Sequence, residues 1–144
     1  MDSESLFREG FNCGQAVLVP HASALGLSEE QAFKLAAGLG AGMGRMQETC
    51  GAVTGACLVL GLRYGHTAAD DKARKEHTYG LIRHFHEEFA TVHLSTRCSD
   101  LLGVDLRTEE GQNSFKEQEL NKTVCLKCVG TADGLVRKIL KENP

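Results

Sequence analysis

The sequence contains no tryptophan and only two prolines, Pro20 and Pro144, in 144 residues. This shortage favours helices over a β-sandwich, whose turns commonly use proline. An excess of basic charge is missing as well. The net charge is −3 and the sequence pI about 6.1, so we expect no nucleic-acid partner. The longest apolar stretch is interrupted by Gly61 and Arg63, so we expect no insertion into a membrane.

A targeting segment is also missing from the start of the sequence. The first ten residues, MDSESLFREG, are acidic and polar rather than basic and then apolar. We therefore expect a cytoplasmic protein. In a reducing compartment, six cysteines are more typical of metal binding or catalysis than of a disulfide framework. A chain of 144 residues buries roughly 70% of its unfolded surface, so residues 1–144 are predicted to form one domain with its own core.

Apolar residues recur at three- and four-residue steps through most of the chain, which predicts an all-α fold. The predicted architecture is a compact single-domain bundle of about five or six helices. The first predicted helix covers residues 3–19 and ends near Pro20, the second is capped by Ser28 with Gln31, and a central buried helix covers 50–62. A long helix is predicted from Asp70 and Asp71 to Val92, with apolar positions at Tyr79, Ile82, Phe85, Phe89 and Val92. A short turn at Cys98, a short helix capped by Thr108 and a last helix loosened at Gly130 complete the prediction.

A glycine-rich loop, Gly38 to Gly44, separates the second and third of these helices. It lacks the Gly-Lys-Ser/Thr ending of a phosphate-binding loop, and no predicted strand precedes it. We interpret it as backbone that permits close approach to a cluster or to a neighbouring helix. Its N–H groups could point toward cysteine sulfurs.

Two features make the cysteines the candidate chemistry of this chain. Cys50 is predicted at a helix start, where the helix dipole and nearby Arg45 would favour its thiolate. Cys125 and Cys128 form a CxxC pair that could share a metal or a disulfide. Cys57, inside the apolar helix, is the best candidate for a purely structural cysteine.

The motifs together resemble a family of redox-active proteins defined by a CGAxxG motif and four characteristic cysteines. The motif stands here as Cys50-Gly51-Ala52-Val53-Thr54-Gly55. The matching stretches cover nearly the whole chain; they are FNCGQAVL, GAGMGRMQETCGAVTGACLVLGLRYG, RCSDLLGVDL and KTVC. The family's four cysteines correspond to Cys13, Cys50, Cys98 and Cys125, which leaves Cys57 and Cys128 as additions.

The chain is also similar to a domain of split-Soret cytochromes, where an iron–sulfur cluster accompanies haem. No haem-attachment sequence is present here, so the resemblance implies the cluster alone. On this basis Cys13, Cys50, Cys98 and Cys125 are the expected ligands of an iron–sulfur cluster used in electron transfer or redox sensing.

Two other readings of the cysteines stay open. One is metal-free thiol–disulfide chemistry, with Cys50 as the attacking thiolate and Cys125 or Cys13 as the resolving thiol. The other is a structural zinc site in a module that binds a partner protein. The expected partner is a redox protein, and the resemblance also implies a link to a transporter, because family members are often encoded beside transport genes. The sequence leaves a homodimer open.

Overall fold

Eight α-helices and no strands form the computed structural model, which describes residues 1–144 throughout. This confirms the all-α prediction. The helices are α1 (Ser3–Arg8), α2 (Cys13–Ala22), α3 (Glu29–Ala36), α4 (Gly51–Tyr64), α5 (Lys72–His93), α6 (Cys98–Leu102), α7 (Glu109–Glu117) and α8 (Leu126–Glu142). Six of them have eight or more residues, in line with the expected number.

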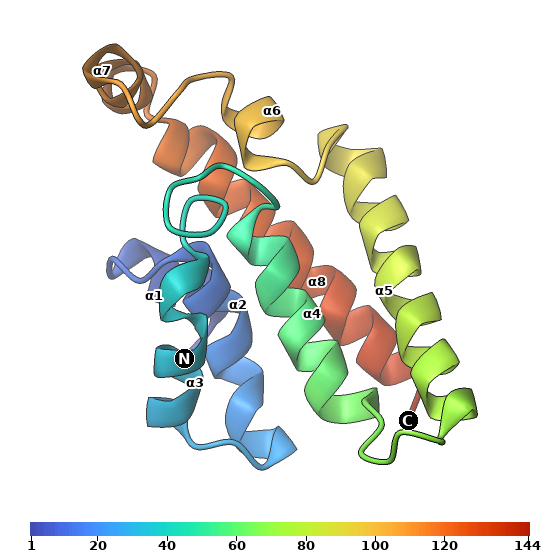
Figure 1. Ribbon diagram of the computed structural model, residues 1–144. Coiled ribbons are helices and arrows are strands. Elements are labelled where there is room, and N and C mark those ends of the chain that lie inside the picture. Colours follow the sequence, from blue (N-terminus) through green and yellow to red (C-terminus); the bar gives the residue numbers. More distant parts are fainter.

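Helix α4 lies in the middle of the bundle, between α2, α5 and α8 (Figure 1). Its sequence is apolar on nearly every side, as expected of a helix surrounded by neighbours. Fully buried side chains from all four helices meet there: Val17, Leu18, Val53, Val59, Leu60, Phe85, Phe89, Val129 and Val136. Burial of each such side chain stabilises the fold by about 1.5–3 kcal/mol.

The predicted caps of three helices are present. The Ser28 side chain accepts a hydrogen bond from the N–H of Gln31, and the Gln31 side-chain oxygen accepts one from the N–H of Ser28. Asp71 caps α5, and Thr108 accepts from the N–H of Gly111 at the start of α7. Each such contact satisfies a backbone donor that the helix itself leaves free.

The single helix predicted over residues 3–19 is wrong in detail. The chain turns at Gly10, whose φ of +109° suits glycine, and a new helix begins after Asn12. Asn12 and Gln15 form a capping box that the sequence pattern could have revealed. As a result, Cys13 starts α2 instead of lying within a helix. The helix also runs past Pro20 to Ala22, although a proline inside a helix removes one N–H donor and its ring crowds the carbonyl four residues earlier.

Two further expectations need correction. Tyr79 and Val92 in α5 are 46% and 60% exposed, so they do not join the core as their spacing predicted. Helix α8 is not loosened at Gly130. A Cβ at Gly130 would lie 2.6 Å from the Glu4 carboxylate, so its glycine admits a side chain of α1. The irregularity comes earlier, in a π-helical turn over Asn121–Cys125.

Helices α2 and α4 cross at backbone contact. A Cβ at Gly55 would lie 2.8 Å from the carbonyl oxygen of Gly14, and one at Gly14 would lie 2.8 Å from Leu39 Cβ. Real side chains do not tolerate such distances, so both positions require glycine. This crossing fixes the start of α2 against the start of α4, which are the ends that carry Cys13 and Cys50.

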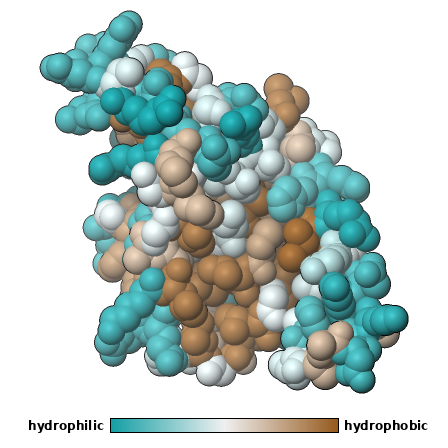
Figure 2. All heavy atoms as spheres, in the orientation of Figure 1, coloured by the Kyte–Doolittle hydropathy of each residue, from teal (hydrophilic) through white to brown (hydrophobic).

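An apolar groove lies on the face formed by α2, α3 and α4, far along α4 from Cys50. It includes Leu35, Leu58 and Leu62, which are 59%, 37% and 41% exposed, and Cys57 lies in its wall. Figure 2 shows the apolar surface that gathers on this face. None of the helices is both long enough and apolar enough to span a bilayer.

The glycine crossing generates a direct test. We expect Gly55→Ala to lower the free energy of unfolding by about 1–3 kcal/mol, because the added methyl group forces α2 away from α4. Gly61→Ala in the same helix is the matched control. Its Cβ would meet nothing within 4 Å, so alanine should be neutral or raise stability by up to about 1 kcal/mol. Urea unfolding of both variants measures this, and equal stabilities would contradict the close crossing.

Candidate cysteine site

Five of the six cysteines line one cavity of about 230 Å³. They are Cys13, Cys50, Cys98, Cys125 and Cys128. The remaining wall is mainly apolar and includes Phe7, Phe11, Leu101, Leu102, Leu106 and Phe115. The structure therefore brings together the four cysteines that sequence reasoning singled out, and it adds Cys128.

Each of these cysteines stands near the beginning of a helix. Cys13 opens α2, Cys50 is the N-cap of α4, and Cys98 opens α6. Cys125 ends the π-helical turn that leads into α8, and Cys128 is the third residue of that helix. These helix ends lie at one end of the bundle, next to the glycine loop (Figure 1). Four separate segments therefore supply the thiols, and the site exists only in the folded chain.

Gly51 makes room for one of the sulfurs. A Cβ at Gly51 would lie 2.6 Å from Cys13 Sγ and 2.6 Å from the carbonyl oxygen of Leu39. Any side chain here would displace the Cys13 sulfur or the loop that covers it. The two glycines of the motif thus have separate tasks, since Gly51 admits a thiol and Gly55 admits the backbone of α2.

The glycine loop adopts a left-handed turn over five consecutive residues. Their φ angles are +50° at Ala41, +68° at Gly42, +73° at Met43, +56° at Gly44 and +65° at Arg45. Three of these are not glycine, and each costs roughly 1–2 kcal/mol in this conformation. The turn brings Ala41 and Gly42 to the cavity wall. The Ala41 N–H favours the thiolate of Cys13, as expected for a loop that supplies amides to the site.

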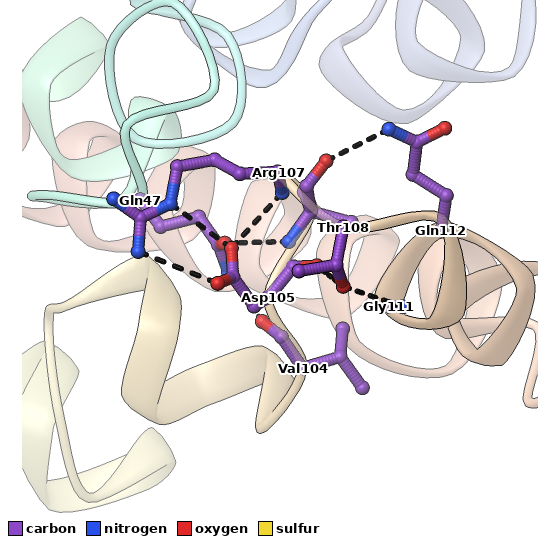
Figure 3. Close-up of polar contacts among 8 residues, drawn as sticks. Gln47, Val104, Asp105, Arg107, Thr108, Gly111 and Gln112 are labelled. Carbon is purple, nitrogen blue, oxygen red and sulfur yellow. Dashed lines mark hydrogen bonds and ion pairs between the residues drawn. The ribbon is translucent and has the colours of Figure 1, made fainter.

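A buried glutamine holds the end of this loop. Gln47, also left-handed at φ +57°, is only 5% exposed. Its side-chain nitrogen donates to the Val104 carbonyl at 2.7 Å, and its side-chain oxygen accepts from the Leu106 N–H at 2.8 Å. Figure 3 shows Gln47 reaching the segment of Val104, beside the Asp105–Arg107 pair. Sequence analysis missed this residue, whose role depends on segments nearly sixty residues apart.

Backbone pairing then joins the two cysteine-bearing segments. The Cys98 N–H donates to the Glu48 carbonyl at 2.7 Å, and the Cys50 N–H donates to the Thr96 carbonyl at 2.8 Å. Thr49 and Arg97 form an isolated antiparallel bridge between these bonds. Cys50 and Cys98 are therefore held in register by main-chain contacts that do not depend on a metal.

The surroundings raise the pKa of the thiols. The pKa of Cys13 is well above its ordinary value, first through interaction with the Cys50 side chain and then through burial. Interaction with Cys128 and burial raise the pKa of Cys50 to about 12, while the Cys13 side chain opposes this. Burial, with the nearby Cys13, raises the pKa of Cys98 to about 11 and that of Cys125 to about 12.

The expected activation of Cys50 is therefore wrong for the metal-free chain. The helix start does not overcome burial and the Cys128 thiol, and Arg45 is not among the groups that shift the pKa of Cys50. The N–H of Ala52 does favour the Cys50 thiolate, but it is the weaker effect. At neutral pH the thiols of Cys13, Cys50, Cys98 and Cys125 are therefore protonated in the reduced, metal-free protein.

The sixth cysteine stands apart. Cys57 lines the apolar groove on the face of α2, α3 and α4 instead of the cavity, as its position inside the apolar helix indicated. Burial alone raises the pKa of Cys57 to about 11. No three His, Cys, Asp or Glu side chains are grouped closely enough to hold a single metal ion.

Comparison with known proteins gives the chain its family. Residues 11–139 match the family described as "Putative redox-active protein (C_GCAxxG_C_C)". The chain belongs to this family. Its members are named for the pattern of separated cysteines, and all four segments that carry the pattern meet at the cavity described above. The family pattern has Gly before Cys, whereas this chain reads Cys50-Gly51. No curated protein and no solved structure matches the chain.

The donor set of the C_GCAxxG_C_C site suits an iron–sulfur cluster. Such clusters are held by cysteine thiolates, and the cavity offers five thiols, a mainly apolar wall and backbone N–H groups directed at sulfur. Cys13, Cys50, Cys98 and Cys125 would hold it. When bound, the cluster would supply one-electron redox chemistry.

The raised pKa values predict slow alkylation of the reduced, metal-free protein. Below its pKa a thiol is mostly protonated, and only the thiolate reacts with iodoacetamide. Since the values for Cys50, Cys98 and Cys125 are about 12, 11 and 12, the rate should rise about tenfold per pH unit from pH 7 to 10. Mass spectrometry of timed samples measures the rate at each cysteine.

The same protein in urea is the control for this measurement. There the rate should level off just above the ordinary cysteine pKa of about 8.5. A plateau at that pH for Cys50 in the folded protein would show that its thiol is not held in the protonated form.

Proposed function

We propose that this protein binds an iron–sulfur cluster through Cys13, Cys50, Cys98 and Cys125 and uses it for electron transfer or redox sensing. The convergence of these thiols on one cavity is the observation that carries the proposal. Four helices direct them inward around space that no side chain of the protein fills. A purely structural set of buried cysteines would pack against core side chains and leave no such space.

The protonation of the thiols favours ligands over a metal-free nucleophile. A catalytic cysteine attacks as a thiolate, and known reactive cysteines have lowered pKa values. The pKa values of Cys50 and Cys125 are instead raised to about 12. A bound metal deprotonates its thiols outright, so the buried thiols need no other activation to serve as ligands. Thiol–disulfide exchange remains the second candidate function, supported by the interaction of Cys50 with two other thiols.

A zinc module has less support from the geometry. Structural zinc needs four ligands at about 2.0–2.3 Å from one point. The cysteines line a cavity, and no three of them are grouped for a single ion. A cluster of several iron and sulfide ions distributes its ligands around a larger core, which corresponds better to thiols spread over a cavity wall.

The cellular setting follows from the chemistry of the site. Reduced thiols and an oxygen-sensitive cluster suit the cytoplasm. A cluster that transfers electrons requires a redox protein that docks close to the cavity. A transporter as the regulated partner and a homodimer are further expectations that this proposal accommodates without depending on them.

Elemental analysis of anaerobically purified protein tests the function. We expect a brown protein with iron and acid-labile sulfide, and Cys50→Ser should lose at least about tenfold in affinity for the cluster. The physical reason is the loss of one thiolate ligand that serine replaces poorly.

Cys57→Ser is the matched control, because Cys57 lies in α4, the helix that Cys50 caps, but lines the apolar groove instead of the cavity. It should keep the full iron content. Colourless wild-type protein whose free thiols change in pairs on reduction would support the disulfide function instead. Zinc without colour would support the interaction module.

A further inference from the structure

Cys128 is the one thiol of the cavity that the proposed cluster does not use. It lies in α8, one helical turn after Cys125, and is 1% exposed. It lines the same cavity as Cys50, and its side chain raises the pKa of Cys50. A second nucleophilic sulfur next to a proposed ligand therefore has no assigned role.

The other neighbour of Cys50 is held more firmly. The Cys13 sulfur lies against Gly51, where even a Cβ would come within 2.6 Å of it. Cys13 is thus confined between α4 and the glycine loop. Cys50 lies at the start of α4 and Cys128 in the first turn of α8, and these two helices pack directly against one another.

We propose that Cys50 and Cys128 form a dithiol pair that a small peroxide oxidises to a disulfide when the cavity holds no cluster, and that this disulfide prevents cluster uptake until it is reduced. The disulfide itself is independent of the proposed function. Its effect on cluster uptake rests on that function, because it removes Cys50 from the ligand set.

The oxidation balances with hydrogen peroxide as the only co-reactant. Cys50 loses its proton, and its sulfur attacks one peroxide oxygen. The O–O bond breaks and the departing hydroxide takes up the proton to form water. Cys128 then attacks the sulfenic sulfur of Cys50, so that the S–S bond forms and the S–O bond breaks. The second hydroxide takes the Cys128 proton. Two thiols and one peroxide give one disulfide and two water molecules.

The size and burial of the site select a small oxidant. Cys50 and Cys128 are 7% and 1% exposed, and the cavity is about 230 Å³ with a mainly apolar wall. Hydrogen peroxide is small and uncharged, so it can enter where a glutathione disulfide is too large to reach both sulfurs.

Tryptic mapping tests the pair without any metal. The sequence places Cys13, Cys98, Cys125 and Cys128 on four different tryptic peptides, while Cys50 shares its peptide with Cys57. The Cys57→Ser variant removes this ambiguity. The metal-free reduced variant is treated with hydrogen peroxide, blocked with N-ethylmaleimide, and digested without reductant. The relevant peptides are Glu9–Lys34, Met46–Arg63, Cys98–Arg107, Thr123–Lys127 and Cys128–Arg137.

We expect Met46–Arg63 to be linked to Cys128–Arg137 as the main product. A main link from Met46–Arg63 to the peptide of Cys13, Cys98 or Cys125 would overturn the pairing. So would the absence of any link, with sulfinic acid at Cys50 as the end product.

Cluster uptake tests the second half of the proposal. Peroxide-treated protein should take up at least about threefold less iron in anaerobic reconstitution than reduced protein, and dithiothreitol should restore it. In Cys128→Ala and Cys128→Ser the sulfenic acid of Cys50 has no resolving thiol, so peroxide should carry Cys50 on to sulfinic acid and dithiothreitol should no longer restore iron uptake. If dithiothreitol restores uptake in these variants as fully as in the wild type, the Cys50–Cys128 disulfide does not control loading. If the reduced wild type takes up no iron at all, the proposed function fails while the peptide mapping still decides the disulfide.

Discussion

The approach of α2 to α4 at backbone contact is the constraint on which the site depends. Gly14 and Gly55 allow the helices to cross, and Gly51 allows the Cys13 sulfur to lie against the first turn of α4. Larger residues would separate the two helix starts that carry Cys13 and Cys50. The motif glycines are therefore requirements of geometry, and the cysteine chemistry is built on them.

Around this crossing, the rest of the fold brings in the other sulfurs. Main-chain hydrogen bonds between the segments of Glu48 and Thr96 place Cys98 beside Cys50. The Gln47 side chain attaches the segment of Glu48 to the loop at Val104. The π-helical turn shifts the register of the chain before α8, so that Cys125 and Cys128 both line the cavity. The strained glycine loop completes the wall, and its cost is of the kind that folded proteins sustain at functional sites.

Much of this could be predicted from the sequence where the signal is local. The caps at Ser28 and Thr108, the apolar helix after Cys50 and the irregular glycine loop follow from residue types at short spacing. The break at Gly10 was predictable too, from Asn12 and Gln15, but the apolar periodicity obscured it. The pattern also predicted that the cysteines matter.

Other properties depend on contacts between distant segments. The pKa of Cys50 is an example, because its helix start predicts a thiolate whereas burial and the Cys128 thiol of α8 stabilise the protonated form. The clamp at Gln47 likewise comes from tertiary packing. No spacing rule along the chain encodes it, since it joins segments separated by more than fifty residues. Cys128 is different, because its CxxC spacing already connects it with Cys125.

The most direct measurement is a crystal structure of protein kept anaerobic from cell lysis onward, with anomalous data collected at the iron absorption edge. The account predicts iron peaks inside the cavity, bonded to the sulfurs of Cys13, Cys50, Cys98 and Cys125. A cavity free of metal, with these four sulfurs unbound to iron in protein that was never exposed to air, would contradict it.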